Sequence, residues 1–131
     1  MPYHINFPPM LFWIALGGAA GSVSRYVLGG AAQKLAGAPF PIGTLLVNVS
    51  GCFLIGILSQ HYMNVQTHPA MRAALITGFC GGYTTFSAFS LEAVGLFGGG
   101  EYLKATAYIL LSVMCSLLAT FAGMAAALRL Q

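Results

Sequence analysis

The sequence has very little charge. Only 5% of its 131 residues are charged, and aspartate is absent. A soluble domain of ordinary composition carries about a quarter charged residues. The acids are Glu92 and Glu101, and the five basic residues are scattered without a basic run. The shortage of charge excludes a soluble globular fold, and the lack of a basic run argues against binding to nucleic acid.

Side chains that build most active sites are also scarce. The sequence has no aspartate that could complete a catalytic triad, and no histidine lies beside a candidate nucleophile. The three cysteines lie in apolar surroundings without CxxC spacing, which is typical of small buried hydrophobic residues rather than of a metal site. We therefore expect that the protein is not an enzyme.

Long apolar stretches make up most of the chain, in which 58% of the residues are hydrophobic. A helix that spans a membrane needs about 20 mostly apolar residues. The sequence predicts an all-α fold, a single membrane domain over residues 1–131 with transmembrane helices at 10–30, 42–62, 70–97 and 102–128. Pro8 and Pro9 are expected to prevent an earlier helix start, and Lys34 is expected in the first turn between spans.

Positive charge is almost evenly divided between the two sides of these predicted spans. An even number of spans places both termini on one side with Arg72 and Arg129, and Lys34 and Lys104 on the other. Membrane orientation normally follows a clear excess of lysine and arginine on one side. The near balance fits insertion in both orientations and also fits a weak bias toward one of them, and polar residues inside the spans favour an oligomer. We therefore expect an antiparallel homodimer.

The third predicted span contains an unusual segment, GFCGGYTTFSAFSLE, at residues 78–92. Gly81 and Gly82 each weaken a helix by about 1 kcal/mol, and the β-branched Thr84 and Thr85 do not restore it. A break in hydrocarbon must be buried in protein, or line a wet cavity or an ion site, where free carbonyl oxygens suit Na⁺. The alternative is an intact helix that crosses a neighbour closely. Close crossings are also favoured by glycines four residues apart, Gly17 with Gly21 and Gly78 with Gly82.

Polar side chains in the other spans can donate hydrogen bonds to a small anion. Thr44 and Asn48 share one face of the second span, and the Asn48 amide has two N–H donors that suit an anion or a neighbouring helix. A series with a spacing of four favours a polar track along the fourth span, although serine and threonine also bond carbonyls one turn back. Its members are Lys104, Tyr108, Ser112, Ser116 and Thr120.

Phe86 and Phe89 lie one turn apart and share a helix face. Packing or lipid contact is their ordinary role, whereas positive ring edges also offer a weak contact to an anion. Glu92 is the only acid well inside a span, and we expect it in a vestibule near water. Arg25 is expected to anchor a helix C-terminus, to draw anions into a vestibule, or to extend toward the membrane surface.

The segments GTLLVNVSG and GFCGGYTTFSAFSLE resemble the signature segments of the Fluc (CrcB-like) fluoride channel family. The first-span segment GGAAGSVSRY and the polar fourth span are similar to that family as well, so the resemblance covers nearly the whole chain. It implies a dual-topology antiparallel homodimer in the bacterial inner membrane. Such a dimer conducts fluoride selectively and passively through pores at its interface, around a central structural Na⁺.

The resemblance also implies roles for individual residues. Backbone carbonyls of Gly81 and Thr84 are expected to hold the sodium ion, with Arg25 and Glu92 near the vestibule. The fluoride pathway is expected to include Asn48, Thr85, Phe86, Phe89, Tyr108 and Ser112. Two residues depart from the family pattern, namely Tyr83, where an aliphatic residue is more usual, and Ala88, where threonine is common.

The alternative function is a small dual-topology four-helix exporter of drugs or other cations. That mechanism depends on a carboxylate within the first span, whereas no acid precedes Glu92 in this chain. A membrane scaffold without transport activity would explain the small residues. It would not explain Asn48, Tyr108 and a broken third span together.

Overall fold

The protein is all-α, and its computed structural model describes residues 7–64 and 69–130. The helices are α1 (Phe7–Ala36), α2 (Ile42–Asn64), α3 (Pro69–Arg72), the π-helix η1 (Ala73–Cys80), α4 (Gly81–Tyr83), α5 (Phe86–Gly98) and α6 (Tyr102–Arg129). Within the described residues, three helices are long and apolar enough to cross a membrane: Pro9–Ala36, Ile42–Met63 and Tyr102–Arg129. The segments from α3 to α5 form a further, broken helix. The prediction of an all-α membrane fold with a broken helix is confirmed.

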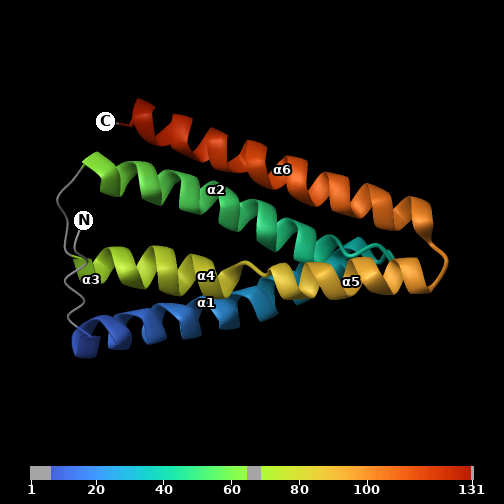
Figure 1. Cartoon of the computed structure of the whole chain (residues 1–131), viewed down its shortest axis with the longest axis horizontal. Helices are drawn as coiled ribbons and strands as arrows, with labels where there is room; N and C mark the ends of the chain where they lie inside the picture. Colours follow the sequence, from blue (N-terminus) through green and yellow to red (C-terminus); the bar gives the residue numbers. More distant parts are fainter. Residues whose placement is uncertain (1–6, 65–68, 131) are drawn as a thin grey trace.

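The helices form an elongated bundle in which successive long segments run in opposite directions (Figure 1). α2 packs along α6, and α1 packs along η1 and α4. The start of α1 and the end of α6 lie at one end of the bundle, and the α5–α6 turn lies at the other (Figure 1). The break between α4 and α5 falls near the middle of the bundle (Figure 1).

Helix α1 is longer than the predicted span at both ends. It begins at Phe7, so the expectation that Pro8 and Pro9 delay the helix start is wrong. Proline is tolerated there because N–H groups in the first turn have no acceptor within the helix. The helix ends at Ala36, and the next residue, Gly37, has φ +58° and donates its N–H to Gln33 O over 3.2 Å. Lys34 therefore lies in the last turn of α1 and not in the following loop.

The predicted glycine pairs meet one another within this chain. Gly17 and Gly21 of α1 face the backbone of η1 and α4, while Gly78 and Gly82 face the backbone of α1. A Cβ atom at any of these positions would overlap a backbone carbonyl oxygen of the opposite helix. The expectation of close helix contacts at these pairs is confirmed.

Glycines also bring α2 and α6 together. A Cβ atom at Gly56 would overlap the Thr120 carbonyl, and one at Gly123 would overlap the Phe53 carbonyl. Since neither backbone can yield locally, a single added methyl group must push the two helices apart. This crossing fixes the position of α6, which carries Tyr108 and Ser112.

We predict that Gly123→Ala destabilises the protein by about 1–3 kcal/mol, the usual cost of overpacking. The measurement is the midpoint of thermal unfolding in detergent. Gly98→Ala is the matched control, because a Cβ atom at Gly98 meets no described atom within 4 Å. A midpoint for Gly123→Ala equal to that of the wild type would contradict the close crossing of α2 and α6.

Candidate functional site

The break consists of two extended threonines. Thr84 has ψ 156°, and Thr85 has φ −149° and ψ 116°, so α4 ends at Tyr83 and α5 begins at Phe86. Gly81 and Gly82 stay helical, although the sequence pointed to them as the weak point. Gly82 serves the close contact with α1. The β-branched threonines are the residues that leave the helix, since branching at Cβ favours extended backbone.

The side chain of Asn48 closes this break. Its Nδ2 donates to Thr85 O over 3.0 Å, and Thr85 N donates to its Oδ1 over 2.7 Å. A carboxamide thus pairs with a backbone peptide as one strand pairs with another. In hydrocarbon each of these peptide groups would cost several kcal/mol if it were left unpaired. Asn48 is therefore a link between α2 and the break within the chain, and its amide retains a second N–H.

Two backbone carbonyls at the break lose the donors that a continuous helix would give them. In a regular helix Thr85 N would bond Gly81 O, and Ala88 N would bond Thr84 O. Here Thr85 N bonds Asn48, and Ala88 N bonds the Thr85 side-chain Oγ1 over 3.1 Å as an N-cap contact. Gly81 O and Thr84 O, the two predicted sodium ligands, are thus released from helical hydrogen bonding.

Glu92 joins three helices. Thr44 Oγ1 of α2 donates to Glu92 Oε1 over 2.7 Å, and Tyr108 OH of α6 donates to Oε2 over 2.6 Å. Glu92 lies in the wall of a pocket of about 800 Å³, which Arg25, Lys34 and Thr44 also line. Both carboxylate oxygens are therefore held by hydroxyl donors where the carboxylate meets a large open space.

Arg25 contacts the same broken helix from α1. Its Nε donates to Gly82 O over 3.0 Å, at the C-terminal end of the short helix α4. A cation at this end of a helix is favoured because the last carbonyls lack intrahelical donors. Of the roles expected for Arg25, anchoring of a helix C-terminus is therefore observed, and its side chain also lines the pocket beside Glu92.

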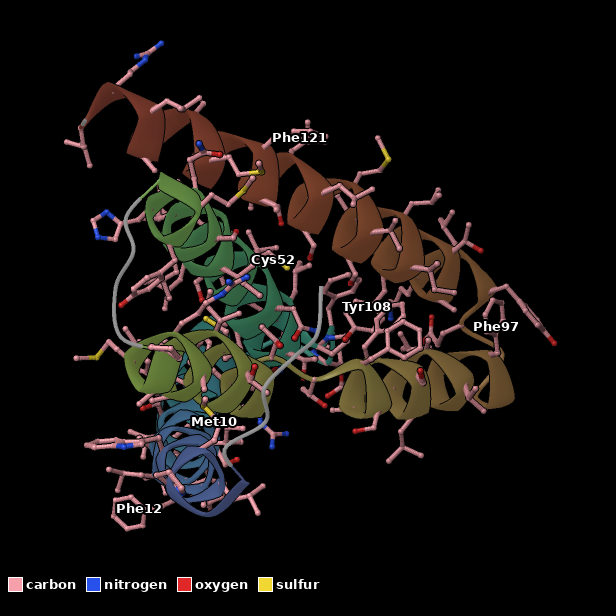
Figure 2. The ribbon with its side chains drawn as sticks, turned by 60° about the vertical axis from the view of Figure 1, so that its left-hand side comes forward. Met10, Phe12, Cys52, Phe97, Tyr108 and Phe121 are labelled. Atoms are coloured by element: carbon pink, nitrogen blue, oxygen red, sulfur yellow. The ribbon has the colours of Figure 1, made fainter. Side chains whose placement is uncertain are left out.

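Aromatic rings form a continuous row beside the break. The ring centroids of Phe86 and Phe89 are 5.3 Å apart, those of Phe89 and Tyr108 are 5.3 Å apart, and those of Tyr108 and Phe40 are 5.5 Å apart. Tyr108 is fully buried and lies between α5 and α6 (Figure 2). Phe86 begins the row with 78% of its surface exposed. Sequence reasoning missed Phe40, because a residue in a proline-flanked turn belongs to no periodic pattern.

Ser112 is a buried hydroxyl without a partner. It is 6% exposed, and its Oγ has no hydrogen bond to any described residue. It lines a second pocket, of about 290 Å³, together with Asn48, Thr85, Phe86 and Phe89. Leaving such a group unpaired costs about 1–3 kcal/mol, so it calls for an explanation. Thr120, in the same helical series, instead donates to Ser116 O over 3.0 Å, the local alternative.

The predicted site residues are thus divided between two neighbouring pockets. Arg25 and Glu92 line the larger pocket, Phe86, Phe89, Asn48 and Ser112 line the smaller one, and Thr85 lines both. Tyr108 and Gly81 line neither pocket, but Tyr108 contacts one lining residue of each, since its ring packs on Phe89 and its hydroxyl bonds Glu92. The other threonine hydroxyl at the break, that of Thr84, donates to the carbonyl of Cys80 one turn back over 2.8 Å.

Comparison with known proteins identifies the family to which the chain belongs. A family model described as "CrcB-like protein, Camphor Resistance (CrcB)" matches residues 12–124. The chain belongs to the CrcB family. The matched residues run from α1 into α6 and include both pockets, so the resemblance read from the sequence segments is confirmed over most of the chain.

Curated relatives match over similar lengths. A protein of Rhizobium meliloti (strain 1021) named "Fluoride-specific ion channel FluC" is 52% identical over 113 residues, which cover 86% of this chain and 90% of that relative. A protein of the same name from Hahella chejuensis (strain KCTC 2396) is 45% identical over 118 residues, covering 89% of this chain and 93% of that relative. The relatives therefore match most of this chain, and the family match at 12–124 includes the break.

We predict that Asn48→Leu opens the break, because the N–H and C=O of Thr85 lose their partners at a cost of about 1–3 kcal/mol each. Hydrogen–deuterium exchange of the amide of Thr85 should accelerate strongly. Ser59→Ala is the control on the same helix, since the Ser59 hydroxyl bonds only the carbonyl of Ile55 one turn back. Unchanged protection of Thr85 in Asn48→Leu would show that the amide does not hold the break.

Proposed function

We propose that this membrane protein is a fluoride-selective ion channel that exports fluoride by passive conduction. Membership of the CrcB family and the names of its relatives support this function. The observation that carries it here is the buried, unpartnered Ser112 hydroxyl, which lines a pocket together with Asn48, Phe86 and Phe89. A hydrogen-bond donor of this kind suits a small anion that must exchange water for protein contacts. As a channel the protein would not catalyse a chemical reaction.

Fluoride is small and strongly hydrated, so a narrow pathway must replace its water with N–H and O–H donors. Ser112 and the second N–H of Asn48 are the donors that the described hydrogen bonds leave available. The hydroxyl proton of Tyr108 is already given to Glu92, and the Thr85 hydroxyl, which accepts from Ala88 N, lies 3.1 Å from the Ser87 hydroxyl, to which it can donate. In our proposal Tyr108 and Thr85 therefore line the pathway, while Ser112 and Asn48 donate to the ion.

The phenylalanines complete the proposed pathway. Phe86 and Phe89 are tilted by 51° relative to each other, so an edge of one ring can face the small pocket without both rings stacking flat. The hydrogens at a ring edge carry partial positive charge, which supports a weak contact to an anion between stronger donors. Arg25 and Lys34 in the larger pocket supply the positive field that would attract fluoride to its entrance.

We further propose an antiparallel dual-topology homodimer in the bacterial inner membrane. Two features of the single chain support a partner at the break. Phe86 is 78% exposed, and a Cβ atom at Gly81 would meet no described atom within 4 Å. No contact within residues 7–64 and 69–130 therefore explains why position 81 is a glycine, whereas a second copy against the break would.

The released carbonyls fit a sodium ion. Gly81 O and Thr84 O lose their helical donors, and neutral carbonyl oxygens are ligands that suit Na⁺ at a helix break. In the dimer, each protomer would contribute these two oxygens to one central ion. The ion would neutralise the carbonyl dipoles and join the two broken helices as a structural component.

The proposed function is tested by fluoride efflux from proteoliposomes, followed with a fluoride electrode, with chloride efflux as the control. We expect rapid fluoride loss and no chloride loss above protein-free vesicles. Absence of fluoride efflux from well-folded protein would refute the channel. Transport of a toxic lipophilic cation in the same vesicles would then favour the alternative exporter.

Phe86→Ile and Phe89→Ile are expected to reduce fluoride efflux nearly to the level of protein-free vesicles, because they keep apolar bulk and remove the ring edges. Size-exclusion chromatography should still show the wild-type oligomer. Leu91→Ala is the control on α5, since Leu91 is 75% exposed and lines neither pocket. Wild-type efflux in both isoleucine variants would exclude a role for the rings.

The sodium proposal predicts that replacing Na⁺ by N-methyl-D-glucamine lowers the thermal stability of the dimer, because a structural ion binds only the folded state. The readout is the melting midpoint in detergent, together with the oligomeric state by analytical ultracentrifugation. Li⁺ or K⁺ serves as the ionic-strength control. Equal midpoints in all of these salts, or a monomer in Na⁺, would contradict the proposed ion site.

A further inference from the structure

The turn between α1 and α2 is fastened by one side chain, that of Gln33. Its Nε2 donates to Ala38 O over 2.8 Å and to Phe40 O over 3.1 Å, and its Oε1 accepts from Gly43 N over 2.9 Å. A carboxamide has two N–H donors and one carbonyl oxygen, and Gln33 uses all three. Each of its partners is a backbone group, so these hydrogen bonds fix the path of the backbone through the turn.

The contact to Gly43 also caps α2. The first N–H groups of a helix have no intrahelical acceptor, and Gly43 lies in the first turn of α2. Gln33 satisfies this N–H from the preceding helix. The next residue is Thr44, whose hydroxyl donates to Glu92. The Gln33 carbonyl oxygen therefore positions the start of α2. This first turn carries Thr44, one of the two hydroxyl donors to Glu92.

The other end of the amide positions Phe40. The Phe40 ring packs edge-on against Tyr108, with the ring planes 86° apart, and Phe89 packs on the same tyrosine. Tyr108 has no exposed surface, and its hydroxyl reaches Glu92 over 2.6 Å. Because Phe89 and Phe40 both contact the tyrosine ring, loss of Phe40 opens space into which Tyr108 can turn.

A turn of Tyr108 would matter for the pathway. Ser112 follows Tyr108 by one helical turn, and residues four apart are neighbours on a helix surface. The Ser112 side chain already lies beside the Tyr108 hydroxyl without a hydrogen bond of good geometry, so a Tyr108 hydroxyl that leaves Glu92 is free to bond Ser112. The donor that we assign to fluoride would then be occupied by a protein group.

We propose that Gln33 and Phe40 are positioning residues for the fluoride pathway: Gln33 fixes the turn, and Phe40 holds Tyr108 on Glu92 so that Ser112 stays free for the ion. This inference rests on the proposed channel function. Neither residue lines the smaller pocket, so each acts through Tyr108 and Thr44 rather than by touching fluoride.

The test is a double-variant cycle measured as the initial rate of fluoride efflux. Phe40→Ala should slow efflux about tenfold in the wild-type background, and by less than about twofold in a Tyr108→Phe background, because coupled residues lose their effect together. Tyr108→Phe removes the hydroxyl that Phe40 is proposed to hold. The inference would be overturned if Phe40→Ala slowed efflux by the same factor in both backgrounds, or if the Phe40→Ala variant had wild-type efflux.

Gln33→Leu and Gln33→Glu form a second comparison. Leucine removes every contact of the amide, whereas glutamate keeps an acceptor for Gly43 N and loses the donors to the Phe40 and Ala38 carbonyls. We expect Gln33→Leu to slow efflux at least as much as Phe40→Ala, with Gln33→Glu between it and the wild type. Leu35→Ala, at an 89% exposed position in the same turn of α1, should leave efflux unchanged. Wild-type efflux in Gln33→Leu would contradict the role of Gln33.

The experiment separates failure of the inference from failure of the proposed function. A wild-type protein without fluoride efflux refutes the channel itself. A conducting wild type with an unaffected Phe40→Ala variant refutes only the positioning residues. If Phe40→Ala does not form the wild-type oligomer, Phe40→Leu replaces it in the cycle, because leucine keeps apolar bulk without the flat ring that holds Tyr108.

Discussion

The reciprocal hydrogen bonds between Asn48 and Thr85 are the interaction on which the site depends. A membrane interior offers no water to a broken backbone, so extended residues are tolerated there only when protein groups pair with them. Asn48 supplies a donor and an acceptor to the N–H and C=O of one residue, Thr85. With both groups paired, α5 can begin again at Phe86, and the carbonyls of Gly81 and Thr84 are released from helical bonding. The break is therefore a stable structural element and not a local defect.

Among the residues that the structure describes, every buried side-chain nitrogen or oxygen has a hydrogen-bond partner except Ser112 Oγ. Glu92 takes one hydroxyl donor on each carboxylate oxygen, Arg25 binds the carbonyl end of α4, and Gln33 uses its whole amide on one turn. Close glycine crossings hold the helices that carry these groups. Against this background an unpartnered, buried hydroxyl beside the break is a specific feature. It gives a physical reason to place an anion there.

The sequence predicted much of this, because each prediction rested on a local signal. Composition predicted the membrane helices, and the glycine spacing predicted the close crossings. The glycine and threonine run left a broken and an intact helix open, and the family resemblance favoured the break. The break itself lies at Thr84 and Thr85, because Gly82 stays helical and packs closely against the backbone of α1. The spacing of glycines in the sequence does not reveal this tertiary contact. Helical periodicity placed Asn48 on a face without indicating that Thr85 lies opposite. Gln33 and Phe40 were missed because a turn has no period, and the dimer and its sodium ion stay predictions because they require a second chain.

The most direct test of passive, selective conduction is the reversal potential of the purified protein in a planar lipid bilayer. For a fluoride channel, a tenfold fluoride gradient should set a reversal potential of about 59 mV in magnitude. A tenfold chloride gradient should leave it near zero. A reversal potential that follows chloride or the accompanying cation, or fluoride movement without any current, would contradict the account.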